Sequence, residues 1–175
     1  MQICSEAEGF ERLVQLGYYL QYRSKYKDYK MYKNYKMVFS TKIPDISGRR
    51  TAIARFVAHE IFEKEDVIFS IDATGIFESC ENLYLFHTFR QGLGINIAIG
   101  ETPCHLLNAA ESDILESLTA LSLYFYWDFS IFSLHKKCLI ECTHDDGLEL
   151  FCDEPSLTDR FKDWSKWLSN DSVST

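Results

Sequence analysis

Three side chains that commonly bind metal ions lie close together in the last third of the chain. Cys138, Cys142 and His144 are separated by even intervals, so on a β-strand they would point to the same face. Cys152 could approach from a neighbouring strand, and four such ligands would suit tetrahedral zinc. The sequence nevertheless lacks the short pairs of cysteines that are typical of structural zinc sites. We therefore expect buried, unpaired cysteines, with no metal or other cofactor.

The same part of the chain offers a second chemistry. His144, Asp145 and Asp146 could hold a divalent ion that activates water, as in a small metal-dependent hydrolase. The triplet runs directly into Gly147, however, and an Asp-Gly pair is typical of a tight turn. A turn is the favoured interpretation, and a hydrolase centred on His144 and Asp145 is the third of three functional hypotheses.

Other ionisable residues lack partners that a sequence can position. Asp72 follows a predicted strand and could act as a general base, but structural roles at strand ends are more common. Cys104 and His105 are adjacent and would point to opposite faces of an extended segment. None of the common phosphate-binding, nucleophile-elbow or zinc-protease motifs occurs. The sequence therefore favours a protein without catalytic residues.

A tyrosine- and lysine-rich segment, YKDYKMYKNYK, is the strongest oddity of composition. Residues 22–36 have a net charge of +5 in a chain of net charge −8, which leaves −13 elsewhere. Tyrosine rings stack on bases and lysines bind phosphates, so single-stranded nucleic acid is an alternative partner. Tyrosine is also favoured in protein interfaces. The residues predicted to bind a partner are Tyr26, Tyr29, Lys30, Tyr32 and Lys33 here, and Asp145, Asp146 and Glu149 in the acidic turn.

Length and composition limit the class of protein. A chain of 175 residues with 46% apolar residues can bury one core, so we expect a single domain over 1–175, with a mobile tail at 169–175. No apolar run reaches the roughly 18 residues of a membrane helix, and no secretory leader is visible. The scattered cysteines predict reduced thiols and a cytoplasmic location. The acidic charge disfavours duplex nucleic acid and suits a basic protein partner.

Hydrophobic periodicity and capping residues predict alternating helices and strands. A capping box at Ser5–Glu8 starts a long first helix that extends to about Lys33. The remaining predicted elements are a strand at 37–43, a helix at 51–64, a strand at 67–73, a helix at 79–92, a strand at 95–99, a helix at 108–125, strands at 128–134, 137–144 and 148–153, and a final helix from Ser156.

This order predicts an α+β fold. We expect a mixed, largely antiparallel sheet with a C-terminal three-strand meander and about five packed helices. Helices on both faces of the sheet are only slightly less favoured than helices on one face.

The run YFYWDFSIFSLHKKCLIECTHDDGLELF supports a distant resemblance. Across Leu115–Phe151 a helix ends in an aromatic-Trp-Asp sequence, and a three-strand meander with a His-Asp turn follows. This layout, and less closely the preceding NLYLFHTFRQGLG helix, resembles small acidic immunity proteins of bacterial toxin systems. The resemblance implies a cytosolic antidote without catalytic residues, whose partner is a basic protein such as a toxin domain. No binding residue is carried over from it. A protein-binding antidote or regulator is the first functional hypothesis, ahead of the nucleic-acid module.

Overall fold

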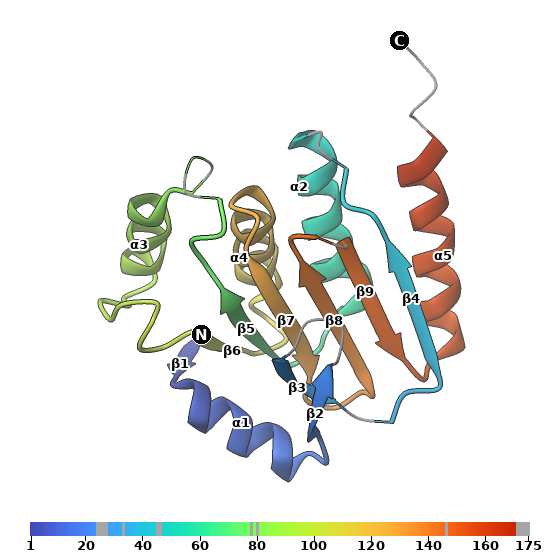
Figure 1. The fold of residues 1–175 in the computed structure, drawn as a ribbon, viewed down its shortest axis with the longest axis horizontal. Coiled ribbons are helices and arrows are strands. Elements are labelled where there is room, and N and C mark those ends of the chain that lie inside the picture. Colours follow the sequence, from blue (N-terminus) through green and yellow to red (C-terminus); the bar gives the residue numbers. More distant parts are fainter. Residues whose placement is uncertain are drawn as a thin grey trace.

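A single seven-stranded antiparallel sheet forms the centre of the computed structural model. The structure describes residues 1–23, 28–32, 34–44, 47–77, 79, 81–145 and 147–170, and within them the strand order is β1-β6-β5-β7-β8-β9-β4 (Figure 1). The strands are β1 (Gln2–Cys4), β4 (Met37–Thr41), β5 (Val67–Ala73), β6 (Cys104–Leu107), β7 (Asp128–Ser133), β8 (Cys138–Thr143) and β9 (Gly147–Cys152). A separate hairpin pairs β2 (Tyr19–Arg23) with β3 (Asp28–Tyr32). The predicted α+β class is confirmed.

The C-terminal meander is formed as predicted. β7 pairs with β8, and β8 pairs with β9, through antiparallel ladders. All six residues of β8 are buried, because β8 lies inside the sheet and both of its faces are covered. β4 then adds to the outer edge of β9, with Phe39 opposite Leu150. The meander therefore connects two strands from the first half of the chain, because β7 pairs with β5 and β9 pairs with β4.

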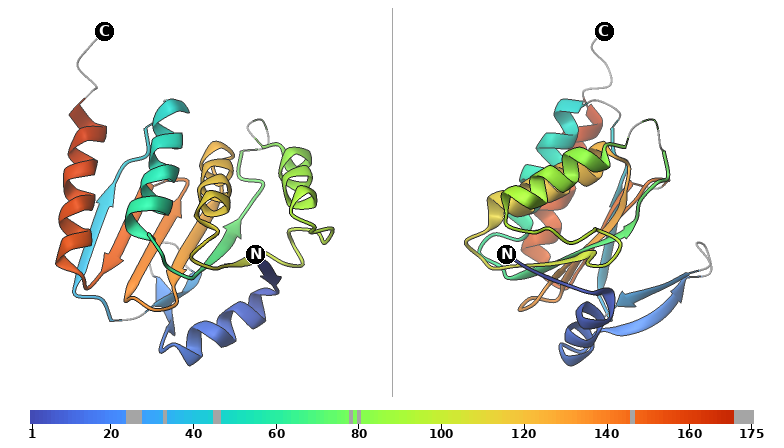
Figure 2. Two further views of the ribbon diagram at one scale, coloured as in Figure 1. Left: turned by 180° about the vertical axis from the view of Figure 1, so that it is seen from behind. Right: turned by 90° about the vertical axis from the view of Figure 1, so that its left-hand side faces the viewer.

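One face of the sheet is covered by helices that follow β4 in the sequence. They are α2 (Ser47–Phe56) with one π-helical turn, η1 (Val57–Ile61), then α3 (Leu83–Gly92), α4 (Ser112–Tyr124) and α5 (Pro155–Asn170) (Figure 2). Beneath them Phe69 of β5 stacks on Phe129 of β7 with ring centroids 5.2 Å apart. Leu118 of α4 is fully buried in the same cluster. No helix among the described residues combines the length and apolar character needed to cross a membrane.

The opposite face is covered by α1 (Glu6–Gln15) and by Tyr18, which lies three residues beyond the end of this helix. Leu13 belongs to one buried cluster with Ile68 and with two further strand residues, Phe132 and Leu139. Tyr18 sets its ring edge-on to Phe132 at 5.4 Å and donates a hydrogen bond to the Ser133 carbonyl. Helices therefore lie on both faces, as the right-hand view of Figure 2 shows.

The predicted long first helix is wrong. The capping box at Ser5 and Glu8 is present, but α1 ends at Gln15. Gly17 follows with φ of +81°, and the amides of Gly17 and Tyr18 bond back to the carbonyls of Val14 and Leu13. This left-handed glycine closes the helix, since other residues adopt that conformation at a cost. The chain beyond it forms the β2–β3 hairpin, which includes part of the tyrosine- and lysine-rich segment.

A second correction concerns the strand predicted at 95–99. These residues are irregular in the structure, with a bend at Ile97, and the strand is β6, at Cys104–Leu107. Ile95 is buried whereas Ile97 is exposed, so the isoleucines do not share one covered face. β6 instead pairs on both sides, with β1 and β5.

The end of the chain differs slightly from the prediction. α5 continues through Asn170, so the first two residues of the predicted mobile tail are helical. Residues 171–175 lie outside the described part of the chain.

Candidate functional site

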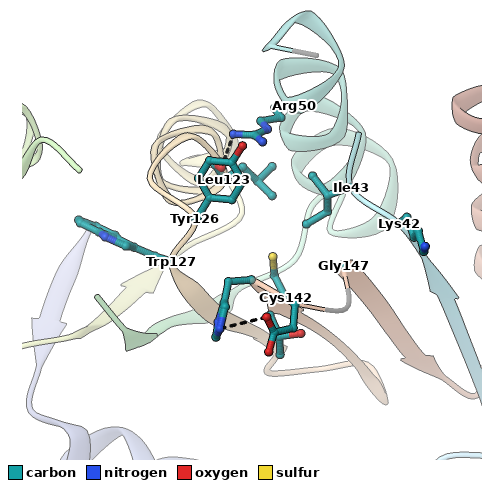
Figure 3. A pocket seen from close by; sticks show the side chains of 11 residues that line it. Lys42, Ile43, Arg50, Leu123, Tyr126, Trp127, Cys142 and Gly147 are labelled. Atoms are coloured by element: carbon teal, nitrogen blue, oxygen red, sulfur yellow. Dashed lines mark hydrogen bonds and ion pairs between the residues drawn. The ribbon is translucent and has the colours of Figure 1, made fainter. Parts of the chain in front are cut away.

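A pocket opens at the end of the sheet where the β8–β9 turn meets α2 and α4. Its volume is about 170 Å³, and its wall includes Arg50, Tyr126, Cys142, His144 and Asp145. Figure 3 shows Arg50 and Tyr126 on one side of the pocket and Cys142 on the other. Its lining therefore comes from the segment after β4, from α2, from the end of α4 and the residues after it, and from β8 with the turn into β9.

Two unusual backbone conformations shape this pocket. Gly147, at the start of β9, has φ of +97°, and a Cβ there would lie 2.3 Å from the Thr41 carbonyl oxygen. Tyr126 has φ of +56°, which turns the chain sharply between α4 and β7. A residue other than glycine in this region is uncommon and is held there by its surroundings.

Arg50 holds Tyr126 in place. The Arg50 side chain is almost completely buried, and its guanidinium lies over the Tyr126 ring at 4.0 Å from the centroid. Its Nη1 donates to the Leu123 carbonyl at the end of α4, and its Nε donates to the Pro44 carbonyl. A cation at a helix C-terminus is favourable because the last carbonyls are otherwise unpaired. Arg50 therefore joins α2 to α4 and forms one wall.

His144 is oriented by a carboxylate that the sequence did not reveal. Both its ring Nδ1 and its backbone N–H contact Oδ1 of Asp128, at 2.9 and 2.8 Å. Because a carboxylate only accepts, the ring donates its Nδ1 proton to Asp128. Nε2 lies 3.4 Å from Oδ1 of Asp145. Carboxylates therefore flank both ring nitrogens of His144.

The thiol beside this pair is not an activated nucleophile. Burial raises the pKa of Cys142 far above its usual value, and the Asp128 and Glu141 carboxylates raise it further. A thiol needs its thiolate form to attack, and no hydrogen bond joins the Cys142 sulfur to His144 in the described structure. Cys142 is therefore not set up to act as a nucleophile.

Asp128→Asn tests the orientation of His144. Loss of the charged acceptor is expected to lower the free energy of unfolding by about 1 to 3 kcal/mol and to increase the mobility of the imidazole. Urea unfolding measures the first effect and the NMR signals of the ring measure the second. Asp145→Asn is the matched control, because the Asp145 side chain is 71% exposed and its removal should cost less than about 0.5 kcal/mol. Equal effects of the two substitutions would contradict this role of Asp128.

Cys138, Cys142 and Cys152 are buried and form no disulfide in the described part of the chain. Cys138 and Cys152 face each other directly across β8 and β9. The hydrogen bond between them, together with burial, raises the pKa of Cys138. His144 lies beyond the end of β8 and pairs with Asp128, so the four predicted ligands do not form one set.

The residues predicted to bind a partner are dispersed. Tyr26, Lys33 and Asp146 lie outside the described residues, while the backbone of Tyr29, Lys30 and Tyr32 lies on β3. Asp145 is at the pocket, as stated above, and Glu149 is half-buried on β9 opposite Glu141.

One further group of metal-binding side chains exists among the described residues. His59 of η1 lies 2.7 Å from Glu116 and 3.7 Å from Asp113, both on α4. Asp113 is almost fully exposed, and such exposed groups occur commonly without an ion. The hydrogen bond between His59 and Glu116 joins two packed helices, so we assign this group a structural role.

Exposed apolar side chains gather beside the pocket. We define the α3 patch as Phe77, Leu83, Tyr84 and Leu85, which are 44%, 42%, 82% and 46% exposed. Phe77 connects the patch to the pocket, because its ring lies 5.4 Å from that of Tyr126 and 6.0 Å from that of His144. Glu81, in the same loop, accepts hydrogen bonds from Trp127 Nε1 and from the Gly75 amide. Phe77 therefore lies at the edge of the pocket, and Leu83, Tyr84 and Leu85 follow at the start of α3.

Comparison with protein-family models, with curated proteins and with solved structures found no match to this chain.

Proposed function

We propose that this protein is a non-catalytic binding protein of the immunity type, which neutralises or regulates a partner protein by covering its functional surface. The α3 patch is the observation that carries the proposal. The partner is a basic protein such as a toxin domain, which this protein binds in the cytoplasm.

The α3 patch has the composition of an interface centre. A surface helix normally turns its apolar side chains toward the core, yet α3 begins with three consecutive apolar residues that all reach solvent. Contiguous exposed apolar groups mark interaction sites, and aromatic side chains dominate the energy of many interfaces. The adjoining pocket of about 170 Å³ is of a size to receive one partner side chain.

Charge supports a basic partner. The chain has a net charge of −8, and Asp145 stands exposed at the pocket. An acidic protein attracts a basic one before contact, which raises the association rate and makes it sensitive to salt. The pocket chemistry also favours binding, because the neutral Cys142 thiol leaves the His144 imidazole without an activated nucleophile beside it.

Removing the α3 patch tests this function. A tagged copy expressed in the native host is used to capture partners, which are identified by mass spectrometry and purified for calorimetry. We expect a stoichiometric complex whose association slows with salt. The double substitution Leu83→Ser and Tyr84→Ala is expected to weaken it by about 30-fold or more, as removal of a central anchor does.

The control substitutions also replace exposed apolar side chains, but on other helices. Val14→Ser on α1 and Trp167→Ala on α5 should leave the affinity unchanged. The proposal fails if the α3 patch variant binds like the wild type, or if no stable protein complex is recovered.

Single-stranded nucleic acid is the second candidate, and the β2–β3 hairpin favours it. Within the described residues this hairpin pairs with no other strand, and its register sets Tyr19 opposite Tyr32 and Tyr22 opposite Tyr29. An isolated, basic, tyrosine-rich ribbon suits base stacking and phosphate contacts. Fluorescence anisotropy with labelled oligonucleotides at low salt tests it, and the absence of binding would exclude it.

A further inference from the structure

Arg90 is a buried cation in the last turn of α3. Its side chain is fully buried, and Nη2 donates to Thr102, at 2.7 Å to the hydroxyl and 3.3 Å to the carbonyl. Nε and Nη1 have no hydrogen-bond partner, and no carboxylate of the described residues pairs with the guanidinium. A guanidinium stays charged at every physiological pH, so this charge is left without a counter-ion from the described chain.

His105 of β6 is a second buried side chain, near enough to this cation to feel its charge. Its ring is fully buried, and neither ring nitrogen makes a hydrogen bond of normal geometry to a described residue, although the backbone of Phe69 and Pro103 lies close enough to favour the protonated ring. Its ring lies edge-on to Phe69 and Phe86. Burial, and then the charge of Arg90, lowers the pKa of His105 to about 4, so the ring is neutral at pH 7. A neutral imidazole can donate one hydrogen bond to a ligand but cannot balance the charge of Arg90.

The surroundings make an unpaired charge costly. Phe86 packs edge-on to Trp127 at 4.9 Å and also contacts His105, so the local medium is aromatic. Buried charges in proteins are normally paired, because desolvation without compensation is unfavourable by several kcal/mol. Guanidinium groups match carboxylate and phosphate oxygens in both charge and geometry.

We propose that Arg90 and His105 bind a small oxyanion, a carboxylate or a phosphate, beneath α3. Arg90 supplies the charge and the Nε and Nη1 donors, and His105 supplies a neutral donor. Thr102 marks the entrance, because it is only half-buried and lies in the connection from α3 to β6. Its hydroxyl accepts from Arg90 and donates to the Ala98 carbonyl at 3.3 Å, so the guanidinium is in contact with a residue that partly reaches solvent.

Titration of the full chain with inorganic phosphate and, separately, with acetate tests the site. Sodium chloride is exchanged for each salt at constant ionic strength, while NMR follows the Arg90 Nε–H and the His105 ring. We expect a saturable shift of both signals with at least one anion, and the responding anion distinguishes phosphate from carboxylate. At ten times the dissociation constant, the melting temperature should rise by roughly 3 to 6 °C. No saturable shift with either anion would overturn the site and assign these donors to water alone.

Arg90→Met provides a second test. Most substitutions in a protein core lower the melting temperature, whereas this one is expected to raise it. If the charge lacks a protein counter-ion, the variant should melt above the wild type in chloride and should lose the anion response. Arg160→Met is the control, since Arg160 is an exposed residue of α5 and its removal should leave the response intact. An Arg90→Met protein that still responds fully to the anion would contradict the proposal. If that variant does not fold, the wild-type titration decides the question.

Discussion

Gly147→Ala is expected to lower the free energy of unfolding by about 3 kcal/mol or more. The residue combines φ of +97° with a backbone approach so close that a Cβ would lie 2.3 Å from the Thr41 carbonyl oxygen. A left-handed conformation alone costs a residue other than glycine about 1 kcal/mol or more, and here β4 would also have to move. Urea unfolding measures the loss, and amide signals of Thr41 and Lys42 should shift with it.

Gly48→Ala is the matched control for this substitution. Gly48 lies in the first turn of α2, is exposed, and has nothing within 4 Å of its ideal Cβ position. Alanine is a better helix former than glycine, so this variant should be as stable as the wild type or more stable by up to about 1 kcal/mol. Comparable destabilisation by both variants would show that the close approach at Gly147 is not the cause.

Acidification from pH 6.5 to pH 4 is expected to remove about 3 kcal/mol of stability through His105. The folded ring has a pKa of about 4 because it is buried beside Arg90, whereas the unfolded ring has an ordinary pKa of about 6.5. Between these values the unfolded chain binds more protons, so the free energy of unfolding falls as the pH falls. Above pH 6.5 the His105 ring is neutral in both the folded and the unfolded state, and its full contribution to stability is present.

His105→Gln isolates this contribution. Urea unfolding at several pH values from 7 to 4 should give a steep loss for the wild type and a much flatter profile for the variant. The carboxyl group of Asp66 has a pKa lowered by its hydrogen bond with His135, so its stabilising effect is lost only at more acidic pH, in both proteins. A variant profile as steep as that of the wild type would exclude His105 as the origin.

Elements with strong local patterns could be predicted from the sequence. The β7–β9 meander follows from alternating apolar residues and an Asp-Gly turn, and α4 follows from its apolar stripe. The Tyr/Lys segment was predicted wrongly because its near-triplet spacing also matches a helix. Gly17 was the local indication of a helix end, and the pairing of Tyr19 with Tyr32 depends on contacts that no periodicity displays.

The candidate site could be predicted only in part. His144 and Asp145 were identified, but Asp128 was not, although a β7–β8 hairpin centred on residues 135–136 sets residue 128 near residue 144. Arg50 reaches the pocket because α2 packs on α4, and this contact cannot be predicted from the spacing of residues in the sequence. The α3 patch was missed for the same reason: Leu83 and Phe86 both fit a core-facing pattern, but only Phe86 is buried.

The pairing of β4 with β9 has a consequence for the order in which the molecule assembles during synthesis. Met37–Thr41 emerges from the ribosome more than a hundred residues before its partner Gly147–Cys152, and Gln2–Cys4 emerges about as long before β6. Both outer strands must wait for later residues, so the nascent chain carries unpaired strand edges until β6 and then the meander are made. Translation of the C-terminal third is therefore the step that completes the sheet.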